Sequence, residues 1–468
     1  MIPLSLAEIA AATGGHVHGD PHIVVTAPAS VDSRAVGSGG LFVAVAGESV
    51  DGHAYAGAAL AGGAAAVLGS RPTEAPTVVV EDTVAALGLL ARHVLDRLPH
   101  VRVLALTGSQ GKTGTKDYLE AVLTGAGPTV ATAGNYNNEI GVPLTALRAG
   151  EDTAYLVVEM GARHVGNIAY LCRVAPPWVA AVVNVGTAHL GEFGSREAIA
   201  RTKGEIVEAL PADGIAVLYA DDPVTAGMAA RTGARVLTFG QHGDVTWRDV
   251  ISDDLARMSF DLGYAGAWHR VSLTQIGAHQ LVNATAAAAM ALAVGLPPAD
   301  VAERLSAARP GSRWRMEAHE REDGVLVIND AYNANPASME AALDTLAAIG
   351  RQGRRTVAVL GEMRELGDEA ERAHVLVGMS AAVAGIDVIV GVGPVARAFA
   401  DGATRHPAWS GEVVETAGRD EALAWLRDNV SSGDVVLVKA SRGVALEHVA
   451  EGLLDESHPD PAEGEPET

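Results

Sequence analysis

The residues best placed to do chemistry lie in a glycine-rich turn within VLALTGSQGKTGTKD, at positions 103–117. An apolar run predicts a strand before this turn, and a helix is expected to begin at Lys112. Gly108 and Gly111 allow backbone N–H groups to close on phosphate oxygens, and the helix N-terminus favours an anion. Lys112 can reach terminal phosphates, and the Thr113 hydroxyl can hold a magnesium ion. The turn therefore predicts a nucleoside triphosphate site.

This turn departs from the most common phosphate loop. The pattern G-x-x-x-x-G-K-[ST] expects glycine at position 106, where the chain has Leu106, so a shorter G-x-x-G-K-T turn remains. A plain glycine turn without a ligand is the alternative interpretation. Because an apolar strand precedes the turn and a helix follows it, we favour the phosphate site.

Two titratable residues further along the chain are candidates for a metal site. Glu159 ends the apolar run LVVE, where a carboxylate is costly unless it meets a cation or faces a cleft, and His189 follows NVGTA. A magnesium ion that binds together with substrate phosphates accepts a carboxylate, a threonine hydroxyl and water, whereas imidazole is a less usual ligand. Taken alone, these residues could be a surface acid and a loop histidine. Beside the phosphate turn, a metal role is favoured for Glu159 and stays open for His189.

Lys203 lies in the helical segment REAIARTKGEIVEAL, fourteen residues after His189. A solvated helix lysine is the usual case. The alternative is a desolvated amine, whose pKa falls below its ordinary value of about 10.4 on burial. Such an amine can react with carbon dioxide to give a carbamate, an anion able to bridge a second metal ion.

Two segments are dense in asparagine, GNYNNEIGVP at 134–143 and DAYNANPAS at 330–338. Side-chain amides both donate and accept hydrogen bonds, which suits sugar hydroxyls and amide-bearing ligands. Turn formation is the alternative, since Asn and Gly populate tight turns. The apolar runs beside both segments favour ligand contact. Arg315, in RWRME, could clamp a phosphate or be an ordinary surface arginine.

The composition limits the classes of protein. A chain of 468 residues suggests three domains at about 150 residues each. A hydrophobic fraction of 48% with only 4% aromatic residues predicts cores built from Ala, Val and Leu. The net charge of −23 argues against a nucleic-acid-binding surface, which needs clustered cations. The single cysteine, Cys172, excludes an internal disulfide and is interpreted as a small buried hydrophobic residue.

Lysine is rare in this chain. Four lysines, at positions 112, 116, 203 and 439, stand against thirty arginines. An acidic protein that binds an anionic nucleotide must concentrate its few cations at the site. Where arginine is the default cation, a retained lysine points to chemistry of its own.

The strands and helices that position these residues fall into three units and a tail. Residues 1–83 hold short strand-like runs among small-residue helices. Residues 84–308 alternate apolar strands and helices, which predicts a parallel sheet covered on both faces, with ligands at the carboxyl ends of its strands. Within this unit, 241–274 are expected to form an antiparallel insertion or edge. Residues 309–454 form a further α/β unit, and the acidic, proline-bearing segment 455–468 is expected to be disordered.

The sequence predicts neither a membrane span nor a secretion signal. The N-terminus lacks a basic stretch and has the pattern of an amphipathic helix. The most apolar run begins at residue 284 and is shorter than the roughly 20 residues that a span needs. We therefore expect a cytoplasmic protein.

Taken together, these segments resemble the Mur ligases, ATP-dependent amide-forming enzymes of peptidoglycan assembly. The similarity covers nearly all of residues 1–455, and the family's short phosphate loop also explains Leu106. Gly114 stands where the familiar loop has a second threonine. The segments that carry the resemblance are DSRAVGSGGLFVAVAGESVDGHAYAGAAL, TGSQGKTGTK, GNYNNEIGVPLTAL, EMGARHVGNIAYL, NVGTAHLGEFGSREAIARTKGEI, HQLVNATAAAA, RWRMEAHE, NDAYNANPASMEAAL and LGEMRELGDEAERAH.

Within the family, NNEIGVP and DAYNANP are similar to the ligase that adds D-alanyl-D-alanine to a UDP-N-acetylmuramoyl-tripeptide, and the D-N-P-R signature of the ligase that adds the third residue is not found. The resemblance implies ATP and Mg²⁺ as cofactors, these two small-molecule substrates, no nucleic acid, and a monomer. It also implies a three-domain α/β architecture. A central parallel-sheet P-loop ATPase domain, 84–308, would be flanked by a small UDP-substrate-binding domain, 1–83, and by a Rossmann-like domain, 309–454, that binds the dipeptide and closes on ATP.

The resemblance also implies roles for individual residues. The residues implied at the nucleotide are Gly108, Ser109, Gln110, Gly111, Lys112, Thr113, Gly114, Asn283 near the adenine, Arg315 at the γ-phosphate and Asp330 at the ribose. The metal would be held by Thr113, Glu159, His189 and a carbamylated Lys203. The residues implied for the substrates are Ser33, Arg34, Asp51, Gly52 and His53 at the UDP end, and Asn137, Asn138, Tyr332, Asn333, Asn335, Lys439 and Ser441 elsewhere. Catalysis would fall to Lys112, Glu159, His189, Lys203 and Arg315.

The implied reaction phosphorylates the terminal carboxylate of the tripeptide, and the amine of the dipeptide then attacks the acyl phosphate. Because two anions must approach within bonding distance, Lys112, Arg315 and the metal would neutralise their repulsion. Three alternatives stay open. The first is another ligase of this fold, either the one that adds a diamino acid or a folate polyglutamate ligase. The second is a P-loop kinase or NTPase. The third is an inactive scaffold in a wall-synthesis complex.

Overall fold

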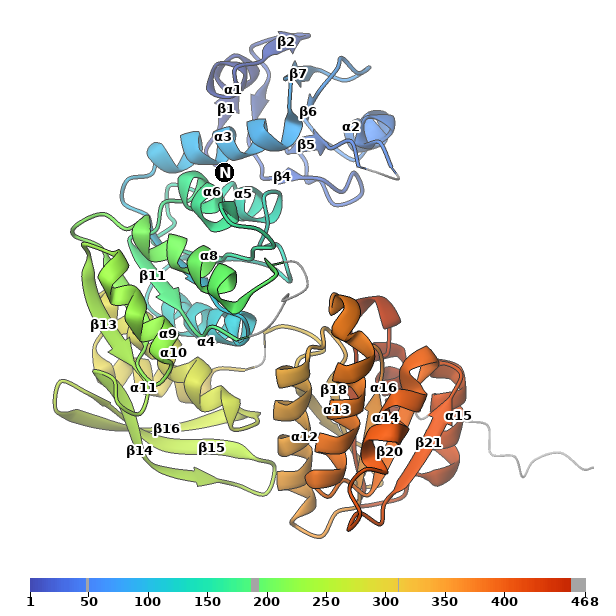
Figure 1. Cartoon of the computed structure of the whole chain (residues 1–468). Coiled ribbons are helices and arrows are strands. Elements are labelled where there is room, and N and C mark those ends of the chain that lie inside the picture. The colour runs from blue at the N-terminus through green and yellow to red at the C-terminus, as the bar shows by residue number, and fades with distance from the viewer. Residues whose placement is uncertain (48–49, 187–192, 310, 456–468) are drawn as a thin grey trace, which may run out of the picture. The chain divides into compact units, whose positions relative to one another are not determined.

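The computed structural model describes residues 1–47, 50–186, 193–309 and 311–455 (Figure 1). Its internal packing divides the chain into two compact units. The first comprises Met1–Arg248, Asp261–Val271 and Val282–Ala308, and the second comprises Asp249–Phe260, Ser272–Leu281 and the chain from Arg309 onward. Apart from Asp455, the predicted tail lies outside the described residues.

The first unit begins with a small α/β layer. Its five-stranded sheet has the order β2-β7-β6-β5-β4, in which β2 is antiparallel to β7 and the remaining pairs are parallel. The strands are β2 (His16–His18), β7 (Thr77–Val79), β6 (Ala66–Gly69), β5 (Leu41–Ala44) and β4 (Ala29–Ser30), with a separate pair of β1 (Leu4–Ser5) and β3 (Val24–Val25). The helices are α1 (Leu6–Thr13), η1 (Gly52–Tyr55), α2 (Ala56–Ala61) and α3 (Thr83–Asp96).

Local capping explains where the first helices begin. Ser5 and Glu8 form a reciprocal capping box at the start of α1, and the Asp82 carboxylate accepts the N–H groups of Val84 and Ala85 at the start of α3. These caps satisfy backbone donors that have no partner inside the helix.

A nine-stranded sheet forms the body of the first unit, in the order β16-β15-β14-β13-β12-β11-β8-β10-β9. Its six central strands are parallel, and the inner four, β12, β11, β8 and β10, are buried on both faces, as the sequence predicts. The six strands are β13 (Arg235–Phe239), β12 (Ile215–Tyr219), β11 (Val179–Val182), β8 (Arg102–Thr107), β10 (Tyr155–Glu159) and β9 (Thr129–Ala131). The helices are α4 (Lys112–Thr124), α5 (Gly141–Ala146), α6 (Asn167–Val174), α8 (Arg196–Glu208), α9 (Pro223–Ala226), η2 (Gly227–Arg231), α10 (His279–Ala293) and α11 (Pro298–Ala307).

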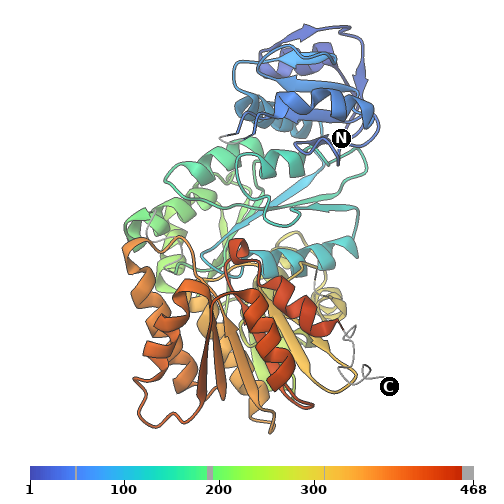
Figure 2. The same cartoon turned by 90° about the vertical axis from the view of Figure 1, so that its right-hand side faces the viewer.

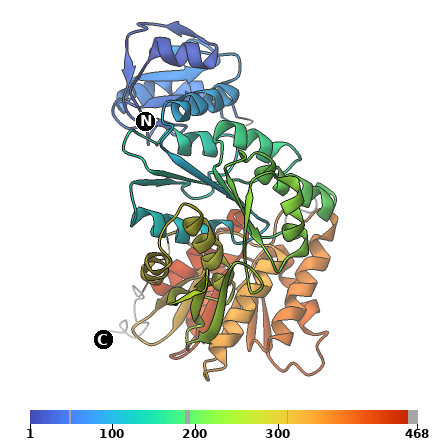
Figure 3. The same ribbon diagram turned by 90° about the vertical axis from the view of Figure 1, so that its left-hand side faces the viewer.

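Three long strands make one edge of this sheet. They are β14 (Val245–Ser252), β15 (Arg257–Tyr264) and β16 (Ala267–Ile276), seen in yellow-green in Figure 3. The edge position agrees with the prediction for 241–274. Each of these strands is divided between the two units, because part of its length packs with the second.

The second unit is built on a six-stranded sheet in the order β17-β18-β22-β19-β20-β21, parallel except for β17. Its strands are β17 (Glu317–Glu320), β18 (Leu326–Asp330), β22 (Val435–Lys439), β19 (Thr356–Leu360), β20 (Val388–Val392) and β21 (Glu412–Thr416). Its helices are α12 (Pro336–Gly350), η3 (Gly367–Glu369), α13 (Ala370–Val383), η4 (Gly393–Val395), α14 (Ala396–Ala403), α15 (Arg419–Asn429), η5 (Arg442–Val444) and α16 (Glu447–Leu454).

Alternate residues of these strands enter two different cores. Leu326 and Ile328 belong to the core under α12, α13 and α14, whereas Val325 and Val327 belong to the core under α15 and α16. Figure 1 shows the two layers of helices on opposite faces of the sheet, and Figure 2 looks onto the face that α15 and α16 cover. The loops at its carboxyl edge are therefore held from both sides.

Cys172 is buried, as expected for a small apolar residue. Among the helices of the described residues, none has the length and apolarity needed to span a bilayer.

Candidate active site

The glycine-rich turn joins β8 to α4, as the sequence predicts. Gly111 immediately precedes the helix and has φ +74°, a conformation that glycine adopts without steric cost. A Cβ atom there would lie 2.3 Å from the side-chain oxygen of Asn283, which α10 brings against the turn. Both the backbone and this close packing therefore require glycine at position 111.

Asn184 holds the turn from the neighbouring strand, and sequence reasoning missed it. Its side-chain oxygen accepts the backbone N–H groups of Ser109 and Gln110, both at 3.0 Å, and its amide nitrogen donates to the Gln110 carbonyl at 3.2 Å. Since β11 lies beside β8, the residue just after β11 meets the turn just after β8. With these two amides engaged, a phosphate bound here relies on the N–H groups at the start of α4.

Two lysines converge on one carbonyl oxygen of the turn. Lys112 Nζ donates to the Gly108 oxygen at 2.8 Å, and Lys203 Nζ, from α8, donates to the same oxygen at 2.9 Å. Burial lowers the pKa of Lys203 well below its ordinary value, the Lys112 cation lowers it further, and Glu159 partly offsets this. The site thus gathers two amines around one carbonyl oxygen, and burial disfavours the charged form of Lys203.

Glu159 ends β10 beside the turn and is only 2% exposed. Its two carboxylate oxygens accept hydrogen bonds from the Thr113 hydroxyl at 2.9 Å and from the Asn137 amide at 2.8 Å. Asn137 is thereby brought beside Glu159, and its contact with substrate stays a prediction. The Asn138 side chain instead caps its own turn, because its oxygen accepts the N–H of Gly141 at 2.9 Å.

The donors around Thr113 and Glu159 fit a magnesium ion. A hydroxyl and a carboxylate in direct contact are hard oxygen ligands, and magnesium binds through few protein ligands together with substrate phosphates. Over the described ranges, no group of three or more His, Cys, Asp and Glu side chains is arranged to hold a metal by itself. The remaining predicted ligand, His189, lies outside the described residues.

In the second unit, Asp330 and Lys439 end the neighbouring strands β18 and β22 and face one another in register. Lys439 Nζ donates to the Asp330 carboxylate at 2.6 Å and to the Asn333 carbonyl at 2.8 Å. The Lys439 side chain is 2% exposed. Its ammonium therefore orders the carboxyl edge of the sheet, and a dipeptide carboxylate would have to displace these partners to reach it.

Arg315 lies on the same edge, stacked over the Tyr332 ring at 4.1 Å. The residues on either side of it are left-handed, Trp314 with φ +59° and Met316 with φ +49°. Such a backbone is strained for bulky side chains and persists only where the surroundings enforce it. Here the Trp314 carbonyl accepts the Tyr332 N–H, and Met316 N–H donates to Asp330. The loop therefore presents Arg315 in a fixed orientation.

The remaining predicted residues of this edge have local partners. Asn335 caps α12 in a reciprocal box with Ser338, and the Asn333 side chain accepts the Ala334 N–H at 2.9 Å. The Ser441 hydroxyl accepts the N–H of Arg364 at 2.9 Å. The turn-forming interpretation of the asparagines thus accounts for these bonds of Asn333 and Asn335.

In the small N-terminal sheet, the Asp51-Gly52-His53 segment forms a tight network. Both ring nitrogens of His53 are engaged. Nε2 accepts the Ser70 N–H at 2.9 Å, so Nδ1 carries the proton and donates to Asp51 at 2.7 Å. Gly52 is packed so closely that a Cβ atom would lie 2.8 Å from the Val45 carbonyl. The His53 side chain is 2% exposed, and its two ring nitrogens link Asp51 to the backbone of Ser70.

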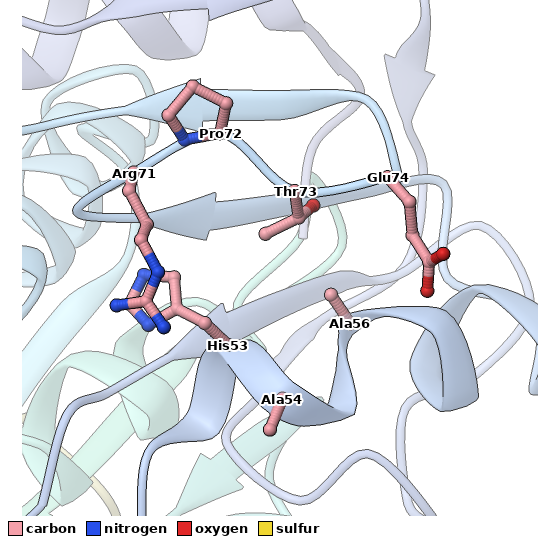
Figure 4. A pocket seen from close by; sticks show the side chains of 7 residues that line it. All are labelled: His53, Ala54, Ala56, Arg71, Pro72, Thr73 and Glu74. Atoms are coloured by element: carbon pink, nitrogen blue, oxygen red, sulfur yellow. The ribbon is translucent and has the colours of Figure 1, made fainter.

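The exposed cation of this network is Arg71, which sequence reasoning also missed. It donates to the Asp51 carboxylate at 2.5 Å and, with His53, holds the pKa of Asp51 well below its usual range. Arg71 and His53 line one end of a hollow of about 280 Å³, and Glu74 lines the other (Figure 4). The hollow also includes Ala54, Ala56, Pro72 and Thr73.

The other two residues predicted in this domain lie on an adjoining turn. Arg34 pairs with Asp32 at 2.8 Å, and this bond helps to lower the pKa of Asp32 to about 2. Ser33 lies between them and is half-buried. Arg34 is 88% exposed, so it stands in solvent in this structure.

Three family models match the chain. They are the Mur ligase family, catalytic domain, at residues 29–96; the Mur ligase middle domain, at 106–291; and the Mur ligase, glutamate ligase domain, at 314–442.

Individual relatives match over nearly the whole length. The UDP-N-acetylmuramoyl-tripeptide–D-alanyl-D-alanine ligase of Mycobacterium tuberculosis (strain ATCC 25618 / H37Rv) is 45% identical, covering 97% of this chain and 98% of its own. A crystal structure of MurF from Acinetobacter baumannii superposes with a TM-score of 0.87 at 34% identity, covering 97% and 99%. The structure of MurF ligase from Thermotoga maritima in complex with ADP gives a TM-score of 0.79 at 32% identity, covering 92% and 97%.

The support that Asn184 gives to the turn can be tested by substitution. Asn184→Ala should lower the free energy of unfolding by about 1–3 kcal/mol, because two backbone N–H groups lose their shared acceptor. Asn184→Asp is the matched comparison, since it keeps the acceptor oxygen but loses the N–H donor to the Gln110 carbonyl. Urea unfolding should place the aspartate variant between wild type and Asn184→Ala, and its affinity for an ATP analogue should be reduced by the added negative charge. Equal loss of stability in both variants would contradict this role.

Proposed function

Since the chain belongs to the Mur ligase family, in its MurF branch, we propose that it joins D-alanyl-D-alanine to UDP-N-acetylmuramoyl-tripeptide and converts ATP to ADP and phosphate. This is a step of peptidoglycan precursor synthesis. The observation that carries the proposal is the nearly full-length likeness to ligases of this name. The family resemblance drawn from the sequence is thereby confirmed, and so is the three-domain architecture that it implied.

The geometry of the turn supports ATP as the energy source. Lys112, Thr113 and Glu159 lie together at the carboxyl ends of β8 and β10, where nucleotides bind parallel sheets. The ADP complex of the Thermotoga maritima relative also supports nucleotide use. Mg²⁺ as the resident cation, a monomeric state and a cytoplasmic location are further parts of the proposal. The first rests on the Thr113–Glu159 pair, and the other two are carried over from the sequence.

In the proposed reaction, a terminal carboxylate oxygen of the tripeptide attacks the γ-phosphorus of ATP, and ADP leaves. The dipeptide amine then attacks the acyl carbon, loses a proton, and inorganic phosphate departs from the tetrahedral intermediate. Lys112 and Arg315 neutralise negative charge on the transferring phosphoryl group. Magnesium, when bound, would withdraw charge from the phosphate oxygens. The enzyme supplies no covalent nucleophile in this scheme.

Other residues divide the substrates between the domains. Asn283 is proposed near the adenine, and Asp330 at the ribose. The UDP end of the tripeptide substrate is proposed to bind at the hollow of the N-terminal sheet. Arg71 would contact its diphosphate there, because it is the exposed cation of the Asp51–His53 network.

The function is tested by measuring phosphate release from ATP with UDP-tripeptide, with and without D-alanyl-D-alanine. Release should require both, and no release with the dipeptide would remove the proposal.

Lys112→Ala should reduce turnover by at least 100-fold without unfolding the protein, because the terminal phosphates lose their cation. Circular dichroism provides the control for folding. Retention of more than a few per cent of activity would exclude Lys112 from the mechanism.

The proposal includes carbamylation of Lys203. Its burial and lowered pKa favour the neutral amine, which is the form that reacts with carbon dioxide. In ¹³C-bicarbonate, the wild type should show a carbamate resonance at neutral pH, absent from Lys203→Ala. The resonance should weaken as the pH falls through the lowered pKa, since protonation removes the nucleophile. A resonance that survives in Lys203→Ala, or none in the wild type, would contradict the carbamate.

Arg71 offers a separate test of the UDP end. Arg71→Gln should raise KM for the UDP-tripeptide by about 10–100-fold, because a charge-assisted contact to the diphosphate is lost, and should leave KM for ATP unchanged. Arg92→Gln is the comparison, since Arg92 pairs with Asp96 on α3 and does not line the hollow. If Arg71→Gln leaves KM for the UDP-tripeptide unchanged, the diphosphate does not bind at this hollow.

A further inference from the structure

We propose that Arg364 is the specificity residue that binds the free carboxylate of the incoming dipeptide, an inference that rests on the proposed function. D-Alanyl-D-alanine brings a nucleophilic amine at one end and a negative carboxylate at the other. The amine must reach the acyl phosphate, so the carboxylate needs a cation about one dipeptide length away. Arg364 stands after β19, on the same carboxyl edge as Asp330 and Lys439.

The loop that carries Arg364 is held by its backbone at several points. Gly361 N–H donates to the Lys439 carbonyl at 3.0 Å, and Met363 N–H donates to the His374 ring at 2.8 Å. Arg364 N–H donates to the Ser441 hydroxyl, and Ser441 N–H donates back to the Glu362 carbonyl, both at 2.9 Å.

The residue after Arg364 has a constrained backbone. Glu365 has φ +64°, a conformation that is uncommon outside glycine and is kept where the surroundings enforce it. The backbone of this loop is therefore constrained, and the constraint fixes the direction of the Arg364 side chain. A loop that only joined β19 to the next helix would not need such constraint.

The Arg364 guanidinium is placed by the neighbouring strand end. Its Nε donates to Glu362 at 3.1 Å, and its Nη2 donates to the Gly443 carbonyl at 3.3 Å. A Cβ atom on Gly443 would lie 1.8 Å from Nη1, so the guanidinium packs directly on a residue that has no side chain. The Arg364 side chain is still 52% exposed. A planar guanidinium held in this way is suited to bidentate binding of a carboxylate.

The other described cations next to this edge are engaged elsewhere. Lys439 is buried between Asp330 and the Asn333 carbonyl. Arg442 stacks on the Trp314 ring at 4.3 Å and pairs with the buried Glu447.

The third of these cations is Arg315, which stacks on Tyr332 and is proposed at the γ-phosphate. Arg364 differs from Lys439 and Arg442 because it is 52% exposed and its acidic partner, Glu362, is exposed as well, so among the described residues of β18, β22 and β19 and the loops after them it is the cation assigned to the dipeptide carboxylate.

Strand spacing favours Arg364 over more distant arginines. The strands run in the order β18-β22-β19-β20-β21, and neighbouring strands lie about 4.8 Å apart, so the end of β19 is about 10 Å from the end of β18. The loop of Arg315, which is proposed at the γ-phosphate, is bonded to that end of β18 through Met316 and Asp330. An extended dipeptide spans about 7 Å, and a guanidinium reaches the remainder. Arg397 and Arg419 follow β20 and β21, about 14–19 Å away on the same spacing, and pair with acids beside them.

The test compares D-alanyl-D-alanine with its C-terminal amide, which keeps the nucleophile and removes the negative charge. Phosphate release by the wild type should show kcat/KM for the acid about 100-fold above that for the amide, as expected for a charge-assisted bidentate contact. Arg364→Gln should lose about 100-fold with the acid and change less than threefold with the amide. KM for ATP and for UDP-tripeptide should not move.

Two further variants distinguish a loss of carboxylate binding from a folding defect. Gly443→Ala should displace the guanidinium and reduce the preference for the acid while Arg364 is still present. Arg372→Gln, at an exposed arginine paired with Glu369 on the nearby helix start, should behave as wild type.

Two results would overturn the assignment. One is a wild type that uses the amide as well as the acid, and the other is an Arg364→Gln enzyme that keeps the full preference for the acid. Both leave the proposed function standing, because each requires dipeptide-dependent phosphate release to be observed. If the wild type shows no such release, the proposed function itself has failed, and the inference that rests on it falls as well.

Discussion

The structure depends on positive charge being held against the carbonyl oxygen of Gly108. Two lysines donate to that oxygen from different helices, and one of them is almost completely buried. Burial lowers the pKa of Lys203, and the Lys112 cation lowers it further, because like charges repel strongly in a medium of low dielectric constant. The Glu159 carboxylate offsets part of this repulsion, and a bound phosphate would offset more. The turn is therefore shaped to receive negative charge.

The four lysines of the chain lie in buried or half-buried positions. Lys116, Lys203 and Lys439 are each no more than 4% exposed, and Lys112 is half-buried at the turn. Arginine serves the surface of this acidic chain, whereas its lysines sit where a compact ammonium can meet a carbonyl or a carboxylate in a closed space. Burial alone would lower the pKa of Lys116, yet Asp117 and Glu120 together raise it. Both lysines are buried, but the pKa of Lys116 is raised and that of Lys203 is lowered, because different charges surround them.

Sequence patterns predicted the elements that are local. The strand, turn and helix around Lys112 and the acid that ends β10 could be predicted, because each depends on a short run of residues. Asn184 and Arg71 could not be, because their roles arise from strand order. Asn184 meets the turn only because β11 pairs with β8, and Arg71 meets Asp51 only because β6 pairs with β5. The same applies to His53, whose type suggested a ligand contact while its two nitrogens are used inside the fold.

The same arrangement recurs in the three larger sheets. A cation or turn at the end of one strand is oriented by an acceptor at the end of the parallel strand beside it. Arg71 is oriented by Asp51, the turn before Lys112 by Asn184, and Lys439 by Asp330. In a parallel sheet the register of these strand ends is fixed by ladders buried on both faces, and a slip of one residue would turn every apolar side chain to the wrong face. Burying the sheets therefore also sets the distances between charged groups. Since that register is fixed before any ligand binds, a charged group at a strand end can be placed accurately even though it lies in a loop.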